Sequence, residues 1–246
     1  MLRRSARPVG THSLDRCSQA GSEGTTTMRD MFHTELEHID DRLVEMTGLV
    51  GAAMVSATQA LLTSDLQIAE SVIAGDSQID RIQREIDSHA VSLLARQQPV
   101  ATDLRVVVAG LRMSATLERM GDLARHLAKI ARLRFPHPCV PPELHGIFAE
   151  MGQIDERLAL KAGRVIQSRD IDIAHELMRD DDELDALHKQ VFDVLLSGGW
   201  NHSVEATVDV TLCSRYYERF GDHAVSLARR VEFLVTGEWD HSGANA

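Results

Sequence analysis

The feature that most constrains how this chain can fold is an internal repeat. The chain reads Glu-Arg-Met-Gly-Asp at residues 118–122 and Glu-Arg-Phe-Gly-Asp at residues 218–222. Each copy is followed by Ala, Leu and Ala in the same register. A single short motif that recurs is weak evidence for duplication, so a second match in the same order is needed to establish a repeat.

The second match lies upstream of each motif. The segment DLQIAESVIAGDSQIDRI, which begins at Asp65, aligns with DIDIAHELMRDDDELDAL, which begins at Asp170. The alignment superimposes two pairs of acidic residues, namely Asp76 on Asp181 and Asp80 on Asp185. Because both matches occur in the same order, the chain is best described as two copies of one structural unit.

The hydrophobic pattern from Met28 onward is that of α-helices. Apolar residues recur at spacings of three and four, and aromatic residues make up only 4% of the chain. Breaks at residues 63–65, at Pro99 and at Gly198–Gly199 interrupt the pattern. The pattern predicts an all-α fold whose helices end near residues 62, 98, 135, 168, 196 and 237. Asp65 or Ser64 is expected to cap the second helix, and Gly237 to close the last one.

A proline-rich segment divides the helices into two groups of three. Residues 136–142 contain four of the six prolines of the chain, which is typical of a domain boundary. Residues 1–27 are rich in Arg, Ser, Gly and Thr, and we expect them to be disordered, with Met28 as a candidate natural start. The predicted organisation is a disordered extension over 1–27, a first three-helix bundle over 28–135, and a second over 136–246.

Charge and cysteine usage narrow the class of function. A net charge of −11 argues against nucleic acid as a partner, because phosphate contacts need a basic surface. The three cysteines, at positions 17, 139 and 213, show neither a disulfide framework nor zinc-binding spacing, which favours a reducing compartment. We expect no stretch to approach a membrane span of about 18–20 apolar residues. These features predict a cytoplasmic protein.

The repeated motif places two carboxylates on one face of a helix. Residues at i and i+4 lie about 40° apart around a helix, so Glu118 and Asp122 point the same way, opposite the apolar stripe. Glu218 and Asp222 repeat the arrangement. The second helix of each copy adds a further pair with the same spacing. The candidate metal ligands are Glu118, Asp122, Glu218, Asp222, Asp76, Asp80, Asp181 and Asp185.

Two interpretations of these acidic pairs stay open at the level of sequence. The first is a solvated polar surface, which is the ordinary role of exposed charges. However, like charges at i and i+4 mildly destabilise a helix, by a few tenths of a kcal/mol, and here the unfavourable spacing occurs in matched sets. The second interpretation is therefore a bound cation shared by neighbouring helices. Oxygen-only sites suit divalent or trivalent ions such as magnesium, manganese, iron or zinc.

Other residues of the motif have simpler explanations. Gly121 and Gly221 each cost about 1 kcal/mol in a helix relative to Ala, so we expect them to permit close approach of a neighbouring helix. Arg119 and Arg219 are expected to form salt bridges with nearby carboxylates, and the alternative is contact with an anion. His223 follows Asp222 directly, but the first copy has Leu at the equivalent position. The chain shows no nucleophile elbow and no phosphate-binding glycine-rich loop, so we expect it not to be an enzyme.

Two segments carry a family resemblance. QQPVATDLRVVVAGLRMSATLERMGDLA and YYERFGDHAVSLARRVEFLVTGE resemble the two hallmark segments of the PhoU family of phosphate-uptake regulators, of the actinobacterial type. The resemblance extends from Met28 to about Glu238. It implies two pseudo-symmetric three-helix bundles and surface metal clusters held by Glu/Asp-x-x-x-Asp motifs. The eight acidic residues named above are the positions on which those motifs fall.

The resemblance also implies a function. PhoU-like proteins are cytoplasmic negative regulators of phosphate uptake and of the phosphate-starvation response. They are thought to connect the ATPase subunit of a phosphate ABC transporter with a phosphate-sensing histidine kinase, and so to be peripheral to the membrane through these partners. A homodimer is expected. The alternatives are a metal-dependent enzyme, a metal-buffering helical bundle, and a helical adaptor that binds no metal.

Overall fold

The computed structural model describes residues 28–238, and this part of the chain contains α-helices and one short 3₁₀ turn but no strand. The expected disordered extension, residues 1–27, lies outside the described residues. The helices are α1 (Met28–Thr63), α2 (Leu66–Gln97), α3 (Thr102–Arg134), α4 (His145–Ser168), α5 (Ile171–Leu195) and α6 (Val204–Thr236), with the turn η1 (Pro142–Leu144) before α4. The all-α prediction is confirmed.

Equivalent caps begin the second helix of each repeat. The side chain of Asp65 accepts hydrogen bonds from the backbone N–H groups of Gln67 (2.9 Å) and Ile68 (3.0 Å) at the start of α2. Asp170 accepts one from the N–H of Asp172 (2.9 Å) at the start of α5. These bonds satisfy N–H groups that have no partner within the helix. Asp65, rather than Ser64, is therefore the cap of α2.

The last helix, α6, ends where the pattern predicted. It begins at Val204, because Ser203 accepts a hydrogen bond from the N–H of Ala206 and caps the helix there. α6 ends before Gly237, whose φ of 77° is the left-handed conformation that glycine adopts readily. The fourth helix starts at His145, since residues 142–144 form the 3₁₀ turn.

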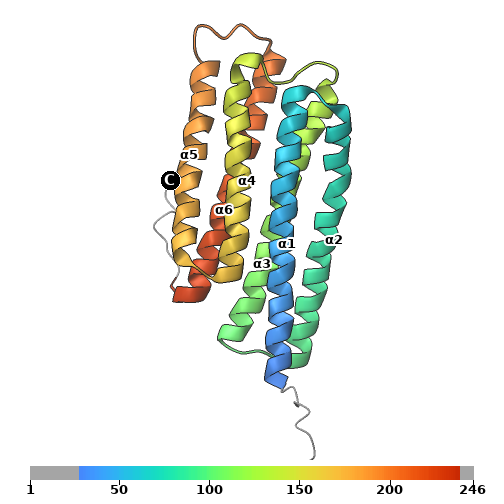
Figure 1. The fold of residues 1–246 in the computed structure, drawn as a ribbon, viewed down its shortest axis with the longest axis vertical. Helices are drawn as coiled ribbons and strands as arrows, with labels where there is room; N and C mark the ends of the chain where they lie inside the picture. Colours follow the sequence, from blue (N-terminus) through green and yellow to red (C-terminus); the bar gives the residue numbers. More distant parts are fainter. Residues whose placement is uncertain (1–27, 239–246) are drawn as a thin grey trace, which may run out of the picture.

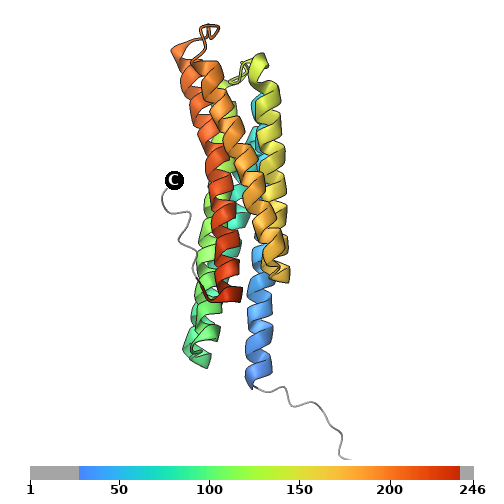
Figure 2. The same cartoon turned by 90° about the vertical axis from the view of Figure 1, so that its left-hand side faces the viewer.

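The six helices form two groups of three that lie side by side (Figure 1). α1, α2 and α3 pack against one another, as do α4, α5 and α6, while α1 packs along α4 and α3 along α6. The turned view shows an elongated molecule with α3 and α6 running together (Figure 2). Buried side chains from both groups form one continuous core. The domain limits proposed from the sequence stay a prediction.

Small residues allow α1 and α4 to approach closely. A Cβ on Gly163 would lie 2.5 Å from Thr47 Oγ1, and a Cβ on Gly152 would lie 2.6 Å from Thr58 Oγ1. The two contacts are related by the repeat, because Thr47 aligns with Gly152 and Thr58 with Gly163. The interface between the two copies is thus itself built with pseudo-twofold symmetry.

α1 is long and apolar enough to cross a membrane by length and composition alone. Within Met31–Thr63 an 18-residue window has a mean hydropathy of 1.3, so the expectation that no stretch approaches a span was wrong on this criterion. Half of the most apolar window is buried inside the protein, where α1 packs against three other helices. A single such helix is weak evidence for a span, since the core helix of a soluble protein passes the same test.

Candidate functional site: two acidic clusters

The first acidic cluster forms where α2 and α3 meet. Asp76 and Asp80 come from α2, and Glu118 and Asp122 come from α3. Burial raises the pKa of Glu118, and the charges of Asp122, Asp80 and Asp76 raise it further. Burial likewise raises the pKa of Asp76, and the charges of Asp80 and Asp122 also raise it. The four carboxyl groups predicted from the repeat are therefore close enough to influence one another electrostatically.

An arginine that the sequence did not single out lies inside this first cluster. Arg125, one turn after Asp122 on α3, places its Nη1 2.8 Å from Asp76 Oδ2 and also pairs with Asp122. Asp76 is buried, with 7% of its side chain exposed. The guanidinium opposes the effect of burial and lowers the pKa of Asp76. In the first cluster, a cation of the chain itself thus offsets part of the acidic charge.

The second acidic cluster occupies the equivalent place between α5 and α6. Asp181 and Asp185 come from α5, and Glu218 and Asp222 come from α6. Burial raises the pKa of Asp181 to about 7, together with the charges of Asp185 and Asp222. Burial also raises the pKa of Asp185 and of Glu218, and Asp222 raises both further. The second set of four carboxyl groups therefore also lies in one neighbourhood, and its role as a set of metal ligands stays a prediction.

The two glycines of the motif let the helices come this close. A Cβ on Gly121 would lie 2.8 Å from Ile79 Cδ1 and 3.6 Å from Asp76 Oδ1. A Cβ on Gly221 would lie 2.3 Å from Asp181 Oδ1 and 2.6 Å from Leu184 Cδ2. The predicted role of both glycines in close helix approach is confirmed. Each glycine sits directly beside the carboxylate of the facing helix, so it belongs to the cluster as well as to the packing.

Comparison with known proteins places this arrangement in a family. The sequence matches the PhoU domain twice, over residues 43–131 and 148–231, which is one match for each copy of the repeat.

The chain belongs to the PhoU family.

Mycobacterial members of the family are similar over nearly their whole length. The chain is 48% identical over 210 residues to the phosphate-specific transport system accessory protein PhoU homolog 2 of Mycobacterium tuberculosis, covering 85% of this chain and 99% of that protein. It is 47% identical to PhoU homolog 1 of Mycobacterium leprae, covering 86% and 96%. The resemblance to actinobacterial members is confirmed.

Solved PhoU structures share the fold. The crystal structure of PhoU from Pseudomonas aeruginosa superimposes with a TM-score of 0.76 at 28% identity, covering 84% of this chain and all of that one. The phosphate transport system regulatory protein PhoU from Streptococcus pneumoniae gives a TM-score of 0.74 at 25% identity, covering 85% and 99%. These PhoU proteins are accessory and regulatory proteins by name, and the family is non-enzymatic. The alternative of a metal-dependent enzyme is thereby set aside.

The family resemblance implies metal ions at both clusters, and the two clusters fit such ions to different degrees. Asp181 Oδ1 and Glu218 Oε2 are buried and have no hydrogen-bond partner among the described residues. Buried polar atoms are rarely left without a partner, so these two oxygens fit a role as cation ligands. Carboxylates suit hard cations. Each cluster also contains an arginine of the chain, since Arg125 pairs with Asp76 and Asp122 in the first and Arg215 pairs with Glu218 in the second. The buried oxygens without a partner make the second cluster the better match.

The side chains do not form a preassembled metal cage. Within residues 28–238, no group of three or more His, Cys, Asp or Glu side chains is arranged to hold a metal ion. The eight predicted residues are brought together in two sets of four, but their carboxyl oxygens would have to turn toward a common point. Rotation of an acidic side chain about χ1 and χ2 is inexpensive compared with moving a helix.

Asp155 is a buried acid that the sequence reasoning missed. It lies on α4, fully buried, and neither of its carboxyl oxygens has a hydrogen-bond partner among the described residues. Burial, and then the charge of Asp181, raise the pKa of Asp155 well above its usual value. The sequence did indicate this burial, because Asp155 lies in the apolar stripe of α4 between Met151 and Leu158. Its counterpart in the first copy is Val50, so a comparison of the two copies does not identify this acid.

The arginines and the histidine of the motif lie together on the seam between α3 and α6. Arg119 and Arg219 form no ion pair within residues 28–238, so the expectation of salt bridges with nearby carboxylates was wrong there. Burial lowers the pKa of His223, and the charges of Arg219 and Arg119 lower it further. The charge of Asp222 opposes these effects, so His223 is within electrostatic reach both of the two guanidinium groups and of the second acidic cluster.

Proposed function

We propose that this protein is a cytoplasmic negative regulator of phosphate uptake and of the phosphate-starvation response. In this proposal it acts as an adaptor between the ATPase subunit of a phosphate ABC transporter and a phosphate-sensing histidine kinase. The observation that carries the proposal is the match of both repeats to the PhoU domain, together with 48% identity to a phosphate-specific transport system accessory protein. Peripheral membrane association would come through these partners.

The structure supports an adaptor through the position of its charges. Apolar residues of all six helices build the scaffold, whereas each acidic cluster extends from partly buried carboxyl groups to the surface. Asp185 and Asp222 are exposed at the rim of the second cluster, and Asp122 is 31% exposed in the first. A surface on which carboxylates outnumber their cationic partners attracts cations or basic partner surfaces. Two such faces on one rigid protein suit the simultaneous docking of two partners.

We propose further that metal ions bind these clusters and shape them for docking. Asp181, Asp185, Glu218 and Asp222 would hold a divalent or trivalent ion, with Asp76, Asp80, Glu118 and Asp122 as the equivalent set. A bound cation would replace the repulsion within each set by attraction. Iron, manganese, magnesium and zinc are the candidates. The ion would have a structural role, since it would be exposed on a helix pair and not enclosed in a pocket.

Affinity capture from phosphate-replete cells tests the adaptor role. The full-length protein should recover the transporter ATPase or the histidine kinase. The double variant Asp122→Asn/Asp222→Asn should recover less of both. The matched control is Asp193→Asn, an exposed acid of α5 outside the clusters. Recovery of neither partner by the unaltered protein would overturn the adaptor role.

Elemental analysis tests the metal sites separately. Protein purified without chelator and without a metal-affinity column should carry at least one ion per chain, and Asp222→Asn should lose it. Asp193→Asn should retain it. Metal content that is the same in all three proteins would count against the clusters as ligands. Light scattering on the same samples tests the expected homodimer.

A further inference from the structure

Asp155 is an acid in the interior of the second group of helices. Its side chain is fully buried on α4, and neither of its carboxyl oxygens has a hydrogen-bond partner within residues 28–238. A buried carboxyl group without a partner costs free energy, because it has lost its hydration and gained no bond in exchange. Such groups are rare in folded proteins, and a bound ion is one of the ordinary explanations for them.

The contacts of Gly221 show which way the Asp155 face of α4 is turned. A Cβ on Gly221 of α6 would lie 2.3 Å from Oδ1 of Asp181 on α5 and 3.4 Å from Cδ1 of Leu158 on α4. Leu158 comes one turn after Asp155, so the two side chains share a face of α4. α4 packs along both α5 and α6 (Figures 1 and 2). The face that carries Asp155 is therefore turned toward the inner side of the second acidic cluster.

The electrostatics of Asp155 agree with this placement. Burial raises the pKa of Asp155 well above its usual value, and the charge of Asp181 on α5 raises it further. On α6, burial raises the pKa of Tyr217, and the charge of Asp155 contributes to that rise. Asp155 is thus within electrostatic reach of groups on both helices of the second cluster.

Other acids between α4 and α5 are paired with cations of the chain. Arg157 Nε of α4 lies 2.8 Å from Asp180 Oδ2, and Lys161 Nζ lies 2.9 Å from the same oxygen. Asp181, the next residue of α5, is instead the acid whose charge acts on Asp155. Asp181 Oδ1 is also buried without a hydrogen-bond partner among the described residues. Asp155 and Asp181 therefore bring unpartnered carboxyl oxygens into one buried neighbourhood.

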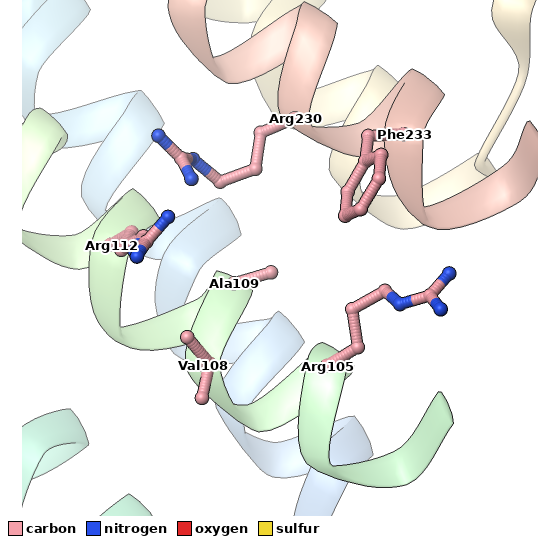
Figure 3. Close-up of a pocket in the computed structure, with 6 residues that line it drawn as sticks. All are labelled: Arg105, Val108, Ala109, Arg112, Arg230 and Phe233. Carbon is pink, nitrogen blue, oxygen red and sulfur yellow. The ribbon is translucent and has the colours of Figure 1, made fainter. Parts of the chain in front are cut away.

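The pocket between α3 and α6 does not compete for a cation. It has a volume of about 300 Å³, and its described lining includes the arginines Arg105, Arg112 and Arg230 (Figure 3). Guanidinium groups repel cations. A cation is therefore drawn to the acids of α4, α5 and α6 and not to this pocket.

We propose that Asp155 is a further ligand of a cation held by the second acidic cluster, and that it acts from α4 on the buried side of the site, next to Asp181. The inference rests on the proposed metal binding of that cluster and adds a third helix to it. Small rotations of the two side chains would bring their oxygens to a common ion. The ion would replace the hydrogen bonds that these oxygens lack and would favour their ionised form.

The equivalent position of the first copy predicts a difference between the two clusters. The repeat places Val50 of α1 opposite Asp155, and Val50 is fully buried as well. The first cluster therefore receives no carboxylate from α1 at this position. The affinity of an oxygen site for a hard cation rises with the number of charged ligands. The second cluster should bind a cation more tightly than the first.

Titration with Mn²⁺ tests the inference on the full chain, from which metal and then chelator have been removed. The electron paramagnetic resonance signal of the free ion measures binding. The background variant Glu118→Gln/Asp122→Asn is used so that the second cluster alone reports. In this background Asp155→Asn should weaken Mn²⁺ binding about tenfold or more. The matched control Asp193→Asn, at an exposed acid of α5, should change it less than about twofold.

Asp155→Val separates a ligand from a residue that serves the fold alone. Valine stands at the equivalent buried position of the first copy. Removal of a buried carboxyl group without a partner should raise the urea midpoint of the metal-free protein. The same change should lower the affinity for Mn²⁺. A gain in stability with a loss of affinity cannot come from a damaged fold.

The outcomes distinguish this inference from the metal binding on which it rests. If the background variant binds no Mn²⁺, metal binding by the second cluster fails and the role of Asp155 fails with it. If it binds Mn²⁺ and folded Asp155→Asn binds the ion equally tightly, the role of Asp155 alone is overturned. A loss of affinity that occurs only together with a loss of stability also overturns the ligand role.

Discussion

The Cβ position of Gly221 on α6 lies 2.3 Å from Oδ1 of Asp181 on α5. The glycine therefore leaves room for the carboxylate, and the same backbone approach buries that carboxylate and raises its pKa to about 7. This one contact thus determines both how closely α5 and α6 approach and how strongly burial raises the pKa of Asp181. The equivalent contact in the first copy is looser, because the nearest atom to a Cβ on Gly121, Ile79 Cδ1, would lie 2.8 Å away.

We expect Gly221→Ala to destabilise the protein by about 1–3 kcal/mol, the usual cost of overpacking a close helix contact. Gly75→Ala is the matched control, since Gly75 lies within α2 with no atom within 4 Å of its Cβ position. That variant should gain up to about 1 kcal/mol from helix propensity. Urea unfolding measures both. A Gly221→Ala variant as stable as Gly75→Ala would show that α5 and α6 are not constrained at this point.

We expect Asp181 to make stability fall as pH rises. Its pKa is raised from 3.8 to about 7 in the folded protein, so the folded state binds more protons than the unfolded state between these values. The free energy of unfolding should then decline with a slope of at most about 1.4 kcal/mol per pH unit from this group.

Asp181→Asn should remove that contribution, while Asp193→Asn should leave the slope as it is. The measurement is urea unfolding from pH 4 to pH 8 in the presence of a chelator, because a bound cation would favour the ionised form. A slope that is identical in wild type and Asp181→Asn would contradict a proton held at this carboxyl group.

We expect Asp76 and Arg125 to be energetically coupled. Their 2.8 Å contact joins a buried carboxylate to a largely buried guanidinium, so Arg125→Gln should cost about 1–3 kcal/mol by leaving Asp76 without its cation. The double variant Asp76→Asn/Arg125→Gln should recover part of that loss. A double-mutant cycle measures the coupling, and additive effects of the two single changes would argue against the pair.

A hydrogen bond should also join the two halves of the chain. The hydroxyl groups of Thr58 on α1 and Tyr217 on α6 lie 2.8 Å apart in the core. Tyr217→Phe should therefore cost about 0.5–1.5 kcal/mol. Tyr216→Phe, at a half-buried neighbour, should change stability by less than about 0.5 kcal/mol. Thermal unfolding of both variants checks this, and the reverse ranking would exclude a contribution of the Thr58 bond to stability.

Much of the candidate site followed from the repeat. Helical periodicity placed Glu218 and Asp222 on one face, and the alignment of Asp76 with Asp181 identified the acids of the facing helices. The loss of helix propensity at Gly121 and Gly221 indicated where those helices touch. Each of these inferences used residues within a few turns of one another or at matched positions of two copies. For such residues, helix geometry fixes the face on which a side chain lies.

The sequence by itself thus determined the six helices, the duplication and the membership of each acidic set. Only the tertiary structure decided that Arg125 enters the first set, that Asp155 is buried beside the second, and that Arg105, Arg112 and Arg230 share a pocket. The reason is that periodicity states which face of a helix is buried but not which helix of the other copy covers it. The pairing of α1 with α4 and of α3 with α6 depends on side-chain packing between segments far apart in the chain.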